Sequence, residues 1–259
     1  MQVWILTFNR PTALNRLIYH FGYLGYKSNI FSNHPDVLLD KSNQQFVNEV
    51  VVNTLNSSES NSWCARSWNT ILMKAMDQDD EVILIQDDTD IAPTFNIWFE
   101  EQKKKYDFIW GPAGDQFHFI RKDVLRKVGW WDERYIGCYC GDAEYVKRVY
   151  MDWDRDRISV EDSHNWGFRH NPSGISENII TTYESKVTAN PGYENQHWEF
   201  ERVCGKDNPT IKHSQKHFRD KWGVDLDNNR PIIENLNRQL PEIDWYPWFS
   251  KKHNFTNRE

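Results

Sequence analysis

Short apolar runs alternate with amphipathic stretches along the first third of the chain. The runs have the length of buried β-strands, and they predict strands at residues 3–8, 29–31, 50–52 and 82–85. From Leu14 to Phe21, and again from Cys64 to Ala75, apolar residues recur at helical spacing and predict two amphipathic helices. Strands that alternate with helices predict an α/β protein with a mostly parallel sheet, whose ligands bind beyond the carboxyl ends of the strands.

The second half of the chain shows a weaker pattern. It predicts strands at residues 107–110 and 117–120, and helices at residues 98–105, 123–128, 142–151 and 214–222. Residues 162–195 are rich in Asn, Ser, Gly and Pro, so we expect a long loop there, close to a functional site.

Composition narrows the class of protein. The chain has 259 residues, of which 15% are aromatic, and this is enough apolar material for one large domain with a packed core. Its 13 Trp residues indicate a wide, partly exposed groove. The net charge of −7, from 38 acidic and 31 basic residues, disfavours nucleic-acid binding because it gives no general basic field.

The location is predicted from what the chain lacks. It has no stretch of about 18 apolar residues and no signal-peptide layout at its N-terminus. We therefore expect no membrane span and a cytoplasmic protein, in the host cytoplasm if a virus or phage encodes it. The four cysteines show no CxxC spacing, so we expect reduced thiols. Lys103-Lys104-Lys105, a sharp basic run, is typical of a solvated helix end.

Three carboxylates follow directly on the apolar run at 82–85. The sequence there reads Asp87-Asp88-Thr89-Asp90 after a single Gln. Like charges this close repel one another, and a divalent cation relieves the repulsion. Oxygen ligands suit Mg²⁺ or Mn²⁺, which keep open positions for substrate phosphates. The alternative is an Asp-rich turn, because Asp caps helices and favours turns.

Four separated segments carry a further signal. The first is Leu6-Thr7-Phe8-Asn9-Arg10-Pro11, and the second runs from Ala65 through Asp90 to Pro93. The third combines Gly129-Trp130-Trp131-Asp132-Glu133 with Gly141-Asp142-Ala143-Glu144 and Arg148. The fourth is Phe218-Arg219-Asp220-Lys221-Trp222-Gly223. In this order they resemble the inverting, metal-dependent GT-A glycosyltransferases of the family 2 type. The resemblance implies a GT-A domain over residues 1–223, with a nucleotide-binding half at about 1–93 and an acceptor-binding half at about 94–223. Residues 224–259 would be a C-terminal extension packed on that domain.

The resemblance also implies the activity and the donor site. Such an enzyme moves a hexosyl or pentosyl group from a nucleotide sugar, first of all a UDP-sugar, to a hydroxyl acceptor. The donor-binding residues would be Thr7, Asn9, Arg10, Asn33, Arg66, Asp87 and Asp88. Asp88 and Asp90 would form the DxD pair that holds Mn²⁺ or Mg²⁺, with Asp87 as the alternate first member and His164 completing the metal site. His170 is the alternative histidine, and a lone histidine is more often structural.

The acceptor side follows from the third segment. Asp142 would be the general base that takes the acceptor proton, and its place at a helix start favours the ionised form. A helix cap is the plain alternative for Asp142, and Glu144 would replace it as base if the register shifts by one turn. The acceptor would contact Trp130, Trp131, Asp132 and Glu133, although core packing is the alternative for the tryptophans.

Two departures from the family pattern bear on these roles. The second strand ends in Ser32-Asn33 where the family has an Asp that recognises the base, so the donor base stays open. The usual Glu-Asp pair before the acceptor-side helix is Gly141-Asp142, which removes one acidic neighbour of the expected base.

Three readings of function stay open at this point. A glycan is the first acceptor class, and a virus or phage enzyme acting on hydroxymethylated DNA bases is the second. The third is a nonenzymatic glycan-binding module with a structural cation. A phosphotransferase is disfavoured because the sequence has no Gly-rich phosphate loop of familiar spacing.

Overall fold

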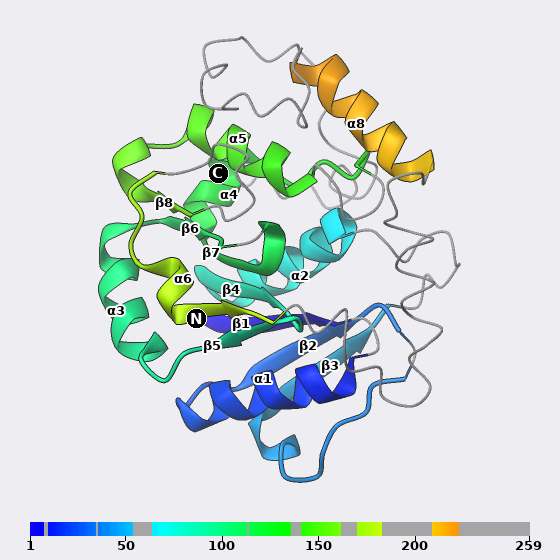
Figure 1. Ribbon diagram of the computed structural model, residues 1–259, viewed down its shortest axis with the longest axis vertical. Helices are drawn as coiled ribbons and strands as arrows, with labels where there is room; N and C mark the ends of the chain where they lie inside the picture. The colour runs from blue at the N-terminus through cyan, green and yellow to red at the C-terminus, as the bar shows by residue number, and fades with distance from the viewer. Residues whose placement is uncertain are drawn as a thin grey trace.

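A seven-stranded sheet runs through the middle of the molecule, with helices on both of its faces (Figure 1). The computed structural model describes residues 1–7, 10–34, 36–53, 64–112, 114–135, 141–161, 170–182 and 209–222. Within these residues no helix combines the length and the apolar character that crossing a bilayer requires. The predicted extension at residues 224–259 lies outside them.

The first half of the chain alternates strands with helices, as its apolar pattern predicts. Its elements are β1 (Gln2–Thr7), α1 (Pro11–Tyr23), β2 (Ser28–Ser32), the 3₁₀ helix η1 (Gln44–Phe46), β3 (Val47–Val52), α2 (Cys64–Gln78) and β4 (Glu81–Gln86). The four predicted strands are therefore confirmed, with ends that differ by a few residues.

The second half is built from shorter elements. They are β5 (Thr89–Ile91), α3 (Phe95–Lys105), β6 (Phe108–Trp110), η2 (Gly114–Gln116), β7 (Phe117–Arg121), α4 (Lys122–Val128), α5 (Gly141–Asp152), η3 (Arg155–Arg157), β8 (Ile158–Val160), α6 (Ile175–Asn178), β9 (Ile179–Thr181) and α8 (Pro209–Trp222). The expected long loop at 162–195 is wrong for part of its length, because α6 and β9 lie within it and β9 pairs with β5. Residues 162–169 and 183–195 lie outside the described part of the chain.

The order of the strands places a ligand site. In the large sheet the order is β3-β2-β1-β4-β7-β6-β8, and β7 is antiparallel to both of its neighbours while the other pairs are parallel. This confirms the expected mostly parallel sheet flanked by helices. From β1 the chain moves outward to β2 and β3 and then returns to the other side of β1 as β4. The winding reverses at the carboxyl ends of β1 and β4, and we call this place the switch point. Open α/β sheets bind ligands at such a point.

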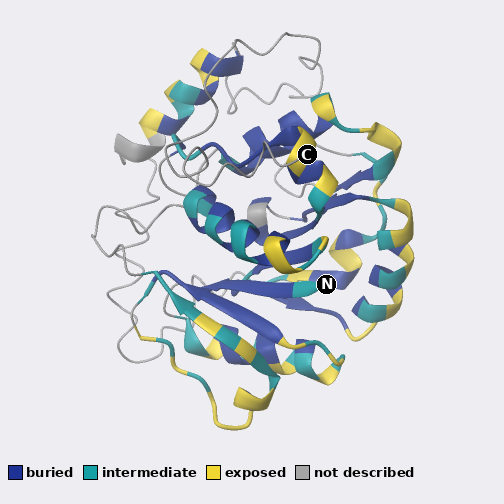
Figure 2. Cartoon of the chain, turned by 180° about the vertical axis from the view of Figure 1, so that it is seen from behind, coloured by how far each residue is buried: buried dark blue, intermediate teal, exposed yellow. Residues whose placement is uncertain are grey.

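Each face of the sheet has its own apolar core. On one face, Val3 and Ile5 of β1 pack with apolar residues of α1 and α3. On the other, Trp4 and Leu6 pack with α2, α4, α5 and α8. Successive side chains of a strand point to opposite faces, so a strand covered on both faces needs an unbroken apolar run. Figure 2 shows the central strands buried along most of their length.

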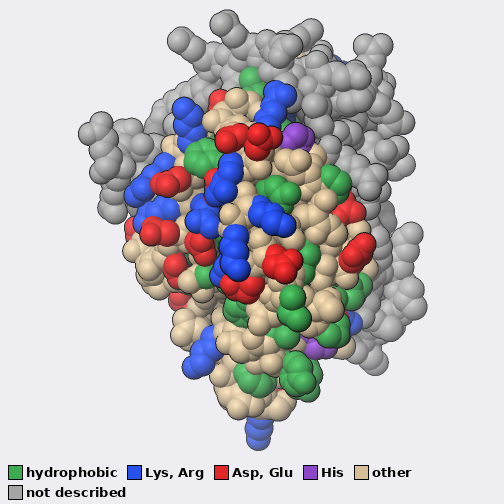
Figure 3. Space-filling model, turned by 90° about the vertical axis from the view of Figure 1, so that its left-hand side faces the viewer, with side chains coloured by type: hydrophobic (Ala, Val, Ile, Leu, Met, Phe, Trp, Pro, Cys, Tyr) green, Lys and Arg blue, Asp and Glu red, His purple; other side chains and the backbone are tan. Residues whose placement is uncertain are grey.

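Basic and acidic side chains are interspersed on the face that includes α3 (Figure 3). Lys103 lies 2.7 Å from Glu100, and Arg121 lies 3.2 Å from both Glu81 and Asp107. Neighbouring carboxylates thus offset positive charge on this face, in keeping with a solvated helix end at residues 103–105.

The core on the α2 side contains a histidine among aromatic rings. His118 of β7 is fully buried, and the ring centroids of Trp131, Trp68 and Trp110 lie 5.2, 5.8 and 6.5 Å from its own. Neither ring nitrogen has a hydrogen-bond partner among the described residues. Burial disfavours the charged ring and lowers the pKa of His118 to about 3. The folded protein therefore holds this histidine neutral in any ordinary buffer.

A pH-dependent loss of stability follows from the buried His118. Below its ordinary pKa of 6.5 the unfolded chain binds a proton that the folded chain binds only near pH 3. The free energy of unfolding therefore falls with pH in this window, by about 1.4 kcal/mol per unit. Between pH 7 and pH 5 we expect the wild type to lose roughly 2 kcal/mol more than His118→Phe, measured by urea unfolding.

The control for this measurement is His213→Gln, which removes an exposed histidine of α8. It should follow the pH dependence of the wild type. If His118→Phe showed the same dependence as well, the burial of a neutral ring would not be its cause.

Candidate functional site

Polar side chains meet where β1 and β4 end next to each other. The Oγ1 of Thr7 donates a hydrogen bond to Oδ2 of Asp87 at 2.5 Å, and both residues are buried. The backbone N–H of Asp87 continues the ladder by donating to the carbonyl oxygen of Leu6 at 3.1 Å. Nη1 of Arg10, just before α1, lies 3.3 Å from a carboxylate oxygen of Asp87 and 3.3 Å from one of Asp88. The structure thus brings four of the predicted donor-site residues together at the point where the winding reverses: Thr7, Arg10, Asp87 and Asp88.

Asp88 differs from its neighbours in how its side chain is engaged. Its Oδ2 faces Arg10, whereas its Oδ1 is buried and has no hydrogen-bond partner among the described residues. Its backbone oxygen accepts hydrogen bonds from the N–H and the hydroxyl of Thr182, at 2.9 and 2.8 Å. Asp88 is therefore fixed in place while one carboxylate oxygen stays available for a ligand.

Asp90 turns toward α1 instead. Its carboxylate lies 3.0 Å from Nε of Arg16 and 2.5 Å from Nδ1 of His20, and it accepts from its neighbour's backbone N–H at 2.8 Å. Asp88 and Asp90 therefore point to different partners here. Within the described ranges no group of three or more His, Cys, Asp or Glu side chains is arranged to hold a metal ion.

Of the two candidate histidines, His170 lies in the described part of the chain and His164 does not. Asn9 of the predicted donor site also lies outside the described residues. His170 exchanges backbone hydrogen bonds with Val160, and its Nε2 lies 2.9 Å from the carbonyl oxygen of Arg155. His170 therefore serves to hold the segment after β8.

A second group of polar side chains lies at the carboxyl ends of β2 and β3. Asn33 comes directly after β2, and its amide donates to the hydroxyl of Ser67 at 3.0 Å and accepts from Asn53 at 2.9 Å. Its backbone N–H donates to the carbonyl oxygen of Thr7 at 3.0 Å. Asn33 is thus placed beside the switch point. Arg66, in contrast, pairs with Glu133 at 3.4 Å and so lies toward the acceptor-side segment.

The expectation that Trp130 and Trp131 form an acceptor platform is wrong. They are only 2% and 1% exposed, and the ring of Trp131 stacks on Tyr145 of α5 at 4.6 Å between centroids. The backbone N–H and carbonyl of Trp131 bond to the amide of Asn69 of α2, at 2.9 and 3.0 Å. The two tryptophans are therefore part of the core between α2 and α5.

The carboxylates of Asp132 and Glu133 are also engaged within the protein. Arg134 binds Asp132 through two hydrogen bonds of 2.8 Å, and Glu133 accepts from Asn69 at 2.9 Å. Burial alone would raise the pKa of Asp132, but hydrogen bonds from His217 and Arg134 and the charge of Lys221 hold it well below its usual range. Burial raises the pKa of Glu133, with Asn69 opposing the shift. In this structure their side chains hold the segment rather than face an acceptor.

Asp142 and Glu144 lie in the first turn of α5, and both are buried. The carboxylate of Glu144 accepts from Arg148 at 2.7 and 3.0 Å and from Lys221 at 2.6 Å. With two cations on its oxygens, Glu144 is not placed to take a proton as the alternative base. Asp142 keeps the position at the helix start that the sequence predicts for the base.

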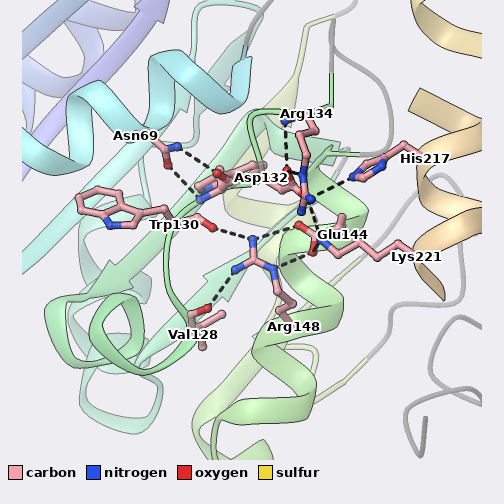
Figure 4. A network of polar contacts seen from close by, with 10 residues as sticks. Asn69, Val128, Trp130, Asp132, Arg134, Glu144, Arg148, His217 and Lys221 are labelled. Carbon is pink, nitrogen blue, oxygen red and sulfur yellow. Dashed lines mark hydrogen bonds and ion pairs between the residues drawn. The ribbon is translucent and has the colours of Figure 1, made fainter. Parts of the chain in front are cut away.

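These contacts form a buried ion network that the sequence analysis did not identify (Figure 4). Arg148 also donates to the carbonyl oxygens of Val128 and Trp130, at 2.9 and 2.7 Å. Lys221 of α8 lies between Asp132 and Glu144, 2.7 and 2.6 Å from their oxygens. Both cations lie in the segments that carry the family resemblance, but nothing in the spacing shows that they meet.

Comparison with known proteins gives similarity at the level of structure. No protein-family model matches the sequence, and no curated protein sequence matches it. The chain is similar to residues 1–349 of S. aureus TarS, with 12% identity and a TM-score of 0.47, over 88% of this chain and 74% of that one. It is also similar to the catalytic domain of Drosophila β1,4-galactosyltransferase 7 in complex with xylobiose, with 13% identity and a TM-score of 0.47, over 88% and 84%. A third is a putative glucose-1-phosphate thymidylyltransferase of Bacillus anthracis, with 10% identity and a TM-score of 0.41, over 62% and 86%. At these values the similarities assign no activity to this chain.

The network predicts a large loss of stability when one cation is removed. Arg148→Met keeps much of the side-chain volume but takes a charge from Glu144 and a donor from each of two buried carbonyls. We expect the free energy of unfolding to fall by about 3–5 kcal/mol, as when one partner of a buried ion pair is lost. Urea unfolding at pH 7 measures it.

The matched control is Arg126→Met, which breaks the exposed pair with Asp123 at 3.1 Å. This change should cost at most about 0.5 kcal/mol. If Arg148→Met cost no more than the control, Arg148 would not stabilise the second half of the molecule.

Proposed function

We propose that the chain is a glycosyltransferase that moves a sugar from a nucleotide-sugar donor to a hydroxyl acceptor, with a glycan as the first acceptor class. The meeting of Thr7, Arg10, Asp87 and Asp88 at the switch point carries the proposal. Open α/β sheets bind nucleotides at this place, and a guanidinium beside a hydroxyl group suits a diphosphate. Asn33, next to this cluster, is the proposed contact to the base, with a UDP-sugar tested first.

Asp88 offers one oxygen ligand for a divalent cation at the switch point. The buried Oδ1 of Asp88 has no hydrogen-bond partner among the described residues, and carboxylate oxygens are the ligands that Mn²⁺ and Mg²⁺ prefer. We assign the first contact with the ion to Asp88. Asp90, which pairs with Arg16 and His20 here, and His164 remain the proposed further ligands. A bound cation would supply positive charge to the diphosphate as it leaves.

Asp142 is the proposed general base. The start of α5 favours an ionised carboxylate, which can accept the proton of an acceptor hydroxyl. Attack by that hydroxyl opposite the leaving diphosphate inverts the anomeric carbon. Arg10 would meanwhile hold the phosphates, and the Thr7–Asp87 hydrogen bond would keep the end of β1 in position.

The donor site is tested by thermal stabilisation. Ligands that bind the folded state raise its melting temperature by mass action. With a panel of nucleoside diphosphates and nucleotide sugars, each with and without Mn²⁺, we expect a metal-dependent rise for one nucleotide. Asp88→Ala should abolish the rise, whereas Asp123→Ala, at an exposed carboxylate of α4, should keep it.

The same measurement separates the competing functions. No rise with any nucleotide, together with a rise for a glycan, would replace the enzyme by a glycan-binding module. Transfer assays that offer glycans beside duplex DNA with hydroxymethylated bases distinguish the two acceptor classes.

The base is tested by Asp142→Asn, which keeps the size of the side chain and removes its basicity. We expect kcat for transfer to fall by about 10²–10⁴-fold, the usual contribution of general base catalysis. Donor binding, measured by the thermal rise, should not change. Retention of wild-type kcat would show that another group accepts the proton. The anomeric NMR signal of the product tests whether transfer inverts the configuration of the anomeric carbon.

A further inference from the structure

One ammonium group joins three parts of the acceptor half. The side chain of Lys221, on α8, is fully buried, and its Nζ lies 2.7 Å from Oδ2 of Asp132 and 2.6 Å from Oε1 of Glu144 (Figure 4). Asp132 is 89 residues away in sequence, and Glu144 is 77 residues away. Lys221 therefore bridges segments that the chain itself does not connect closely.

Each bridged carboxylate belongs to an element of the proposed reaction. Asp132 lies in the segment that Asn69 ties to α2, one residue from the backbone contact of Trp131. Glu144 lies in the first turn of α5, two residues after Asp142. Holding both carboxylates at one point fixes the start of α5 relative to α2.

Within the described part of the chain, Lys221 is the cation that contacts both carboxylates of the network. Arg148 covers Glu144 from its own helix, and Arg134 covers Asp132 from its own segment. Arg148 also joins α5 to the backbone carbonyls of Val128 and Trp130, but it does so one turn after Glu144. Lys221 instead joins the carboxylate of Glu144, in the first turn of α5, to that of Asp132. His217 lies one turn before Lys221 and approaches Oδ2 of Asp132 at 3.3 Å, and among the described residues its ring contacts Tyr135 and His213 rather than α5. Without the ammonium group, two buried carboxylates would face each other across this junction and repel.

The energetic cost of burying the ammonium group of Lys221 indicates that its charge has a role in the structure. Burial lowers the pKa of Lys221 to about 8, while the charge of Glu144 favours the protonated form. A buried ion pair is often no more stabilising than apolar residues of the same volume. Apolar residues would not fix the direction of α5 through two charge-assisted hydrogen bonds.

We propose that Lys221 is a positioning residue for sugar transfer, because it sets the orientation of the first turn of α5 and so of Asp142. This inference rests on the proposed function. It makes α8 a part of the acceptor site rather than an appendage to the donor-binding sheet. Lys221 itself touches neither donor nor acceptor in this role.

The test compares Lys221→Met with Lys216→Met in steady-state kinetics. Lys216 lies on the same helix and pairs with Asp220, but it is exposed, so the same change there removes a charge without touching the junction. For Lys221→Met we expect kcat for transfer to fall about 100-fold, the effect of misplacing a catalytic group by about 1 Å. The donor KM and the metal-dependent nucleotide rise in melting temperature should stay as in the wild type.

Rescue separates positioning from general weakening of the fold. Lys221→Arg restores a cation between the two carboxylates, and it should recover at least a tenth of the wild-type kcat, roughly tenfold above Lys221→Met. Lys216→Met should keep kcat within about twofold, as for an exposed pair. If Lys221→Met does not fold, Lys221→Gln, which keeps a donor without the charge, takes its place with the same expected loss.

The outcomes distinguish this inference from the proposed function. If the wild type neither binds nucleotides nor transfers sugar, both are overturned. If the wild type transfers sugar and the folded Lys221 variant keeps its kcat, only the positioning role is overturned. A kcat loss accompanied by an equal loss of nucleotide binding would also overturn it, because the effect would then extend to the donor site.

Discussion

Buried charge is the constraint on which the second half of this molecule depends. Lys221, Arg148, Glu144 and Asp132 are each at most 4% exposed, and an isolated charge at such a depth costs several kcal/mol. Their partners come from α5, α8 and the segment that follows α4. Lys221 of α8 pairs with carboxylates of the other two parts, so its charge is paired there only when α8 docks on them.

The first half obeys a different rule, which is sheet topology. In β1 and β4, Leu6 lies opposite Gln86, so the next residues of both strands, Thr7 and Asp87, reach the carboxyl edge together. The chain reverses its winding at this point. The apolar register of two strands thus delivers two polar side chains to one place. The proposed donor side is therefore a product of backbone pairing, whereas the proposed acceptor side is a product of side-chain charge.

This difference explains what the sequence could predict. Apolar runs predicted β1 to β4, and strand order follows from crossover rules, so the cluster around Asp87 was within reach of sequence reasoning. The Trp130-Trp131 pair was not, because two adjacent aromatic residues have no periodicity that distinguishes a core from a sugar platform. β5 and β9 were missed because their three residues, Thr89-Asp90-Ile91 and Ile179-Ile180-Thr181, form no unbroken apolar run such as Phe108-Ile109-Trp110 of β6. The ion network joins residues up to 89 positions apart, and local spacing holds no information on such pairs.

The spacing of two side chains on α8 has a consequence for how this protein can change. His217 and Lys221 are four residues apart, and both reach the same oxygen of Asp132. A slide of α8 by one turn, about 5.4 Å, would carry the ammonium group of Lys221 away from Asp132 and Glu144, so this pairing favours the observed register of the helix. Substitutions at Asp132 and on this face of α8 should therefore covary among homologous sequences. A chimaera that exchanges α8 must carry the 132–134 segment and the first turn of α5 with it.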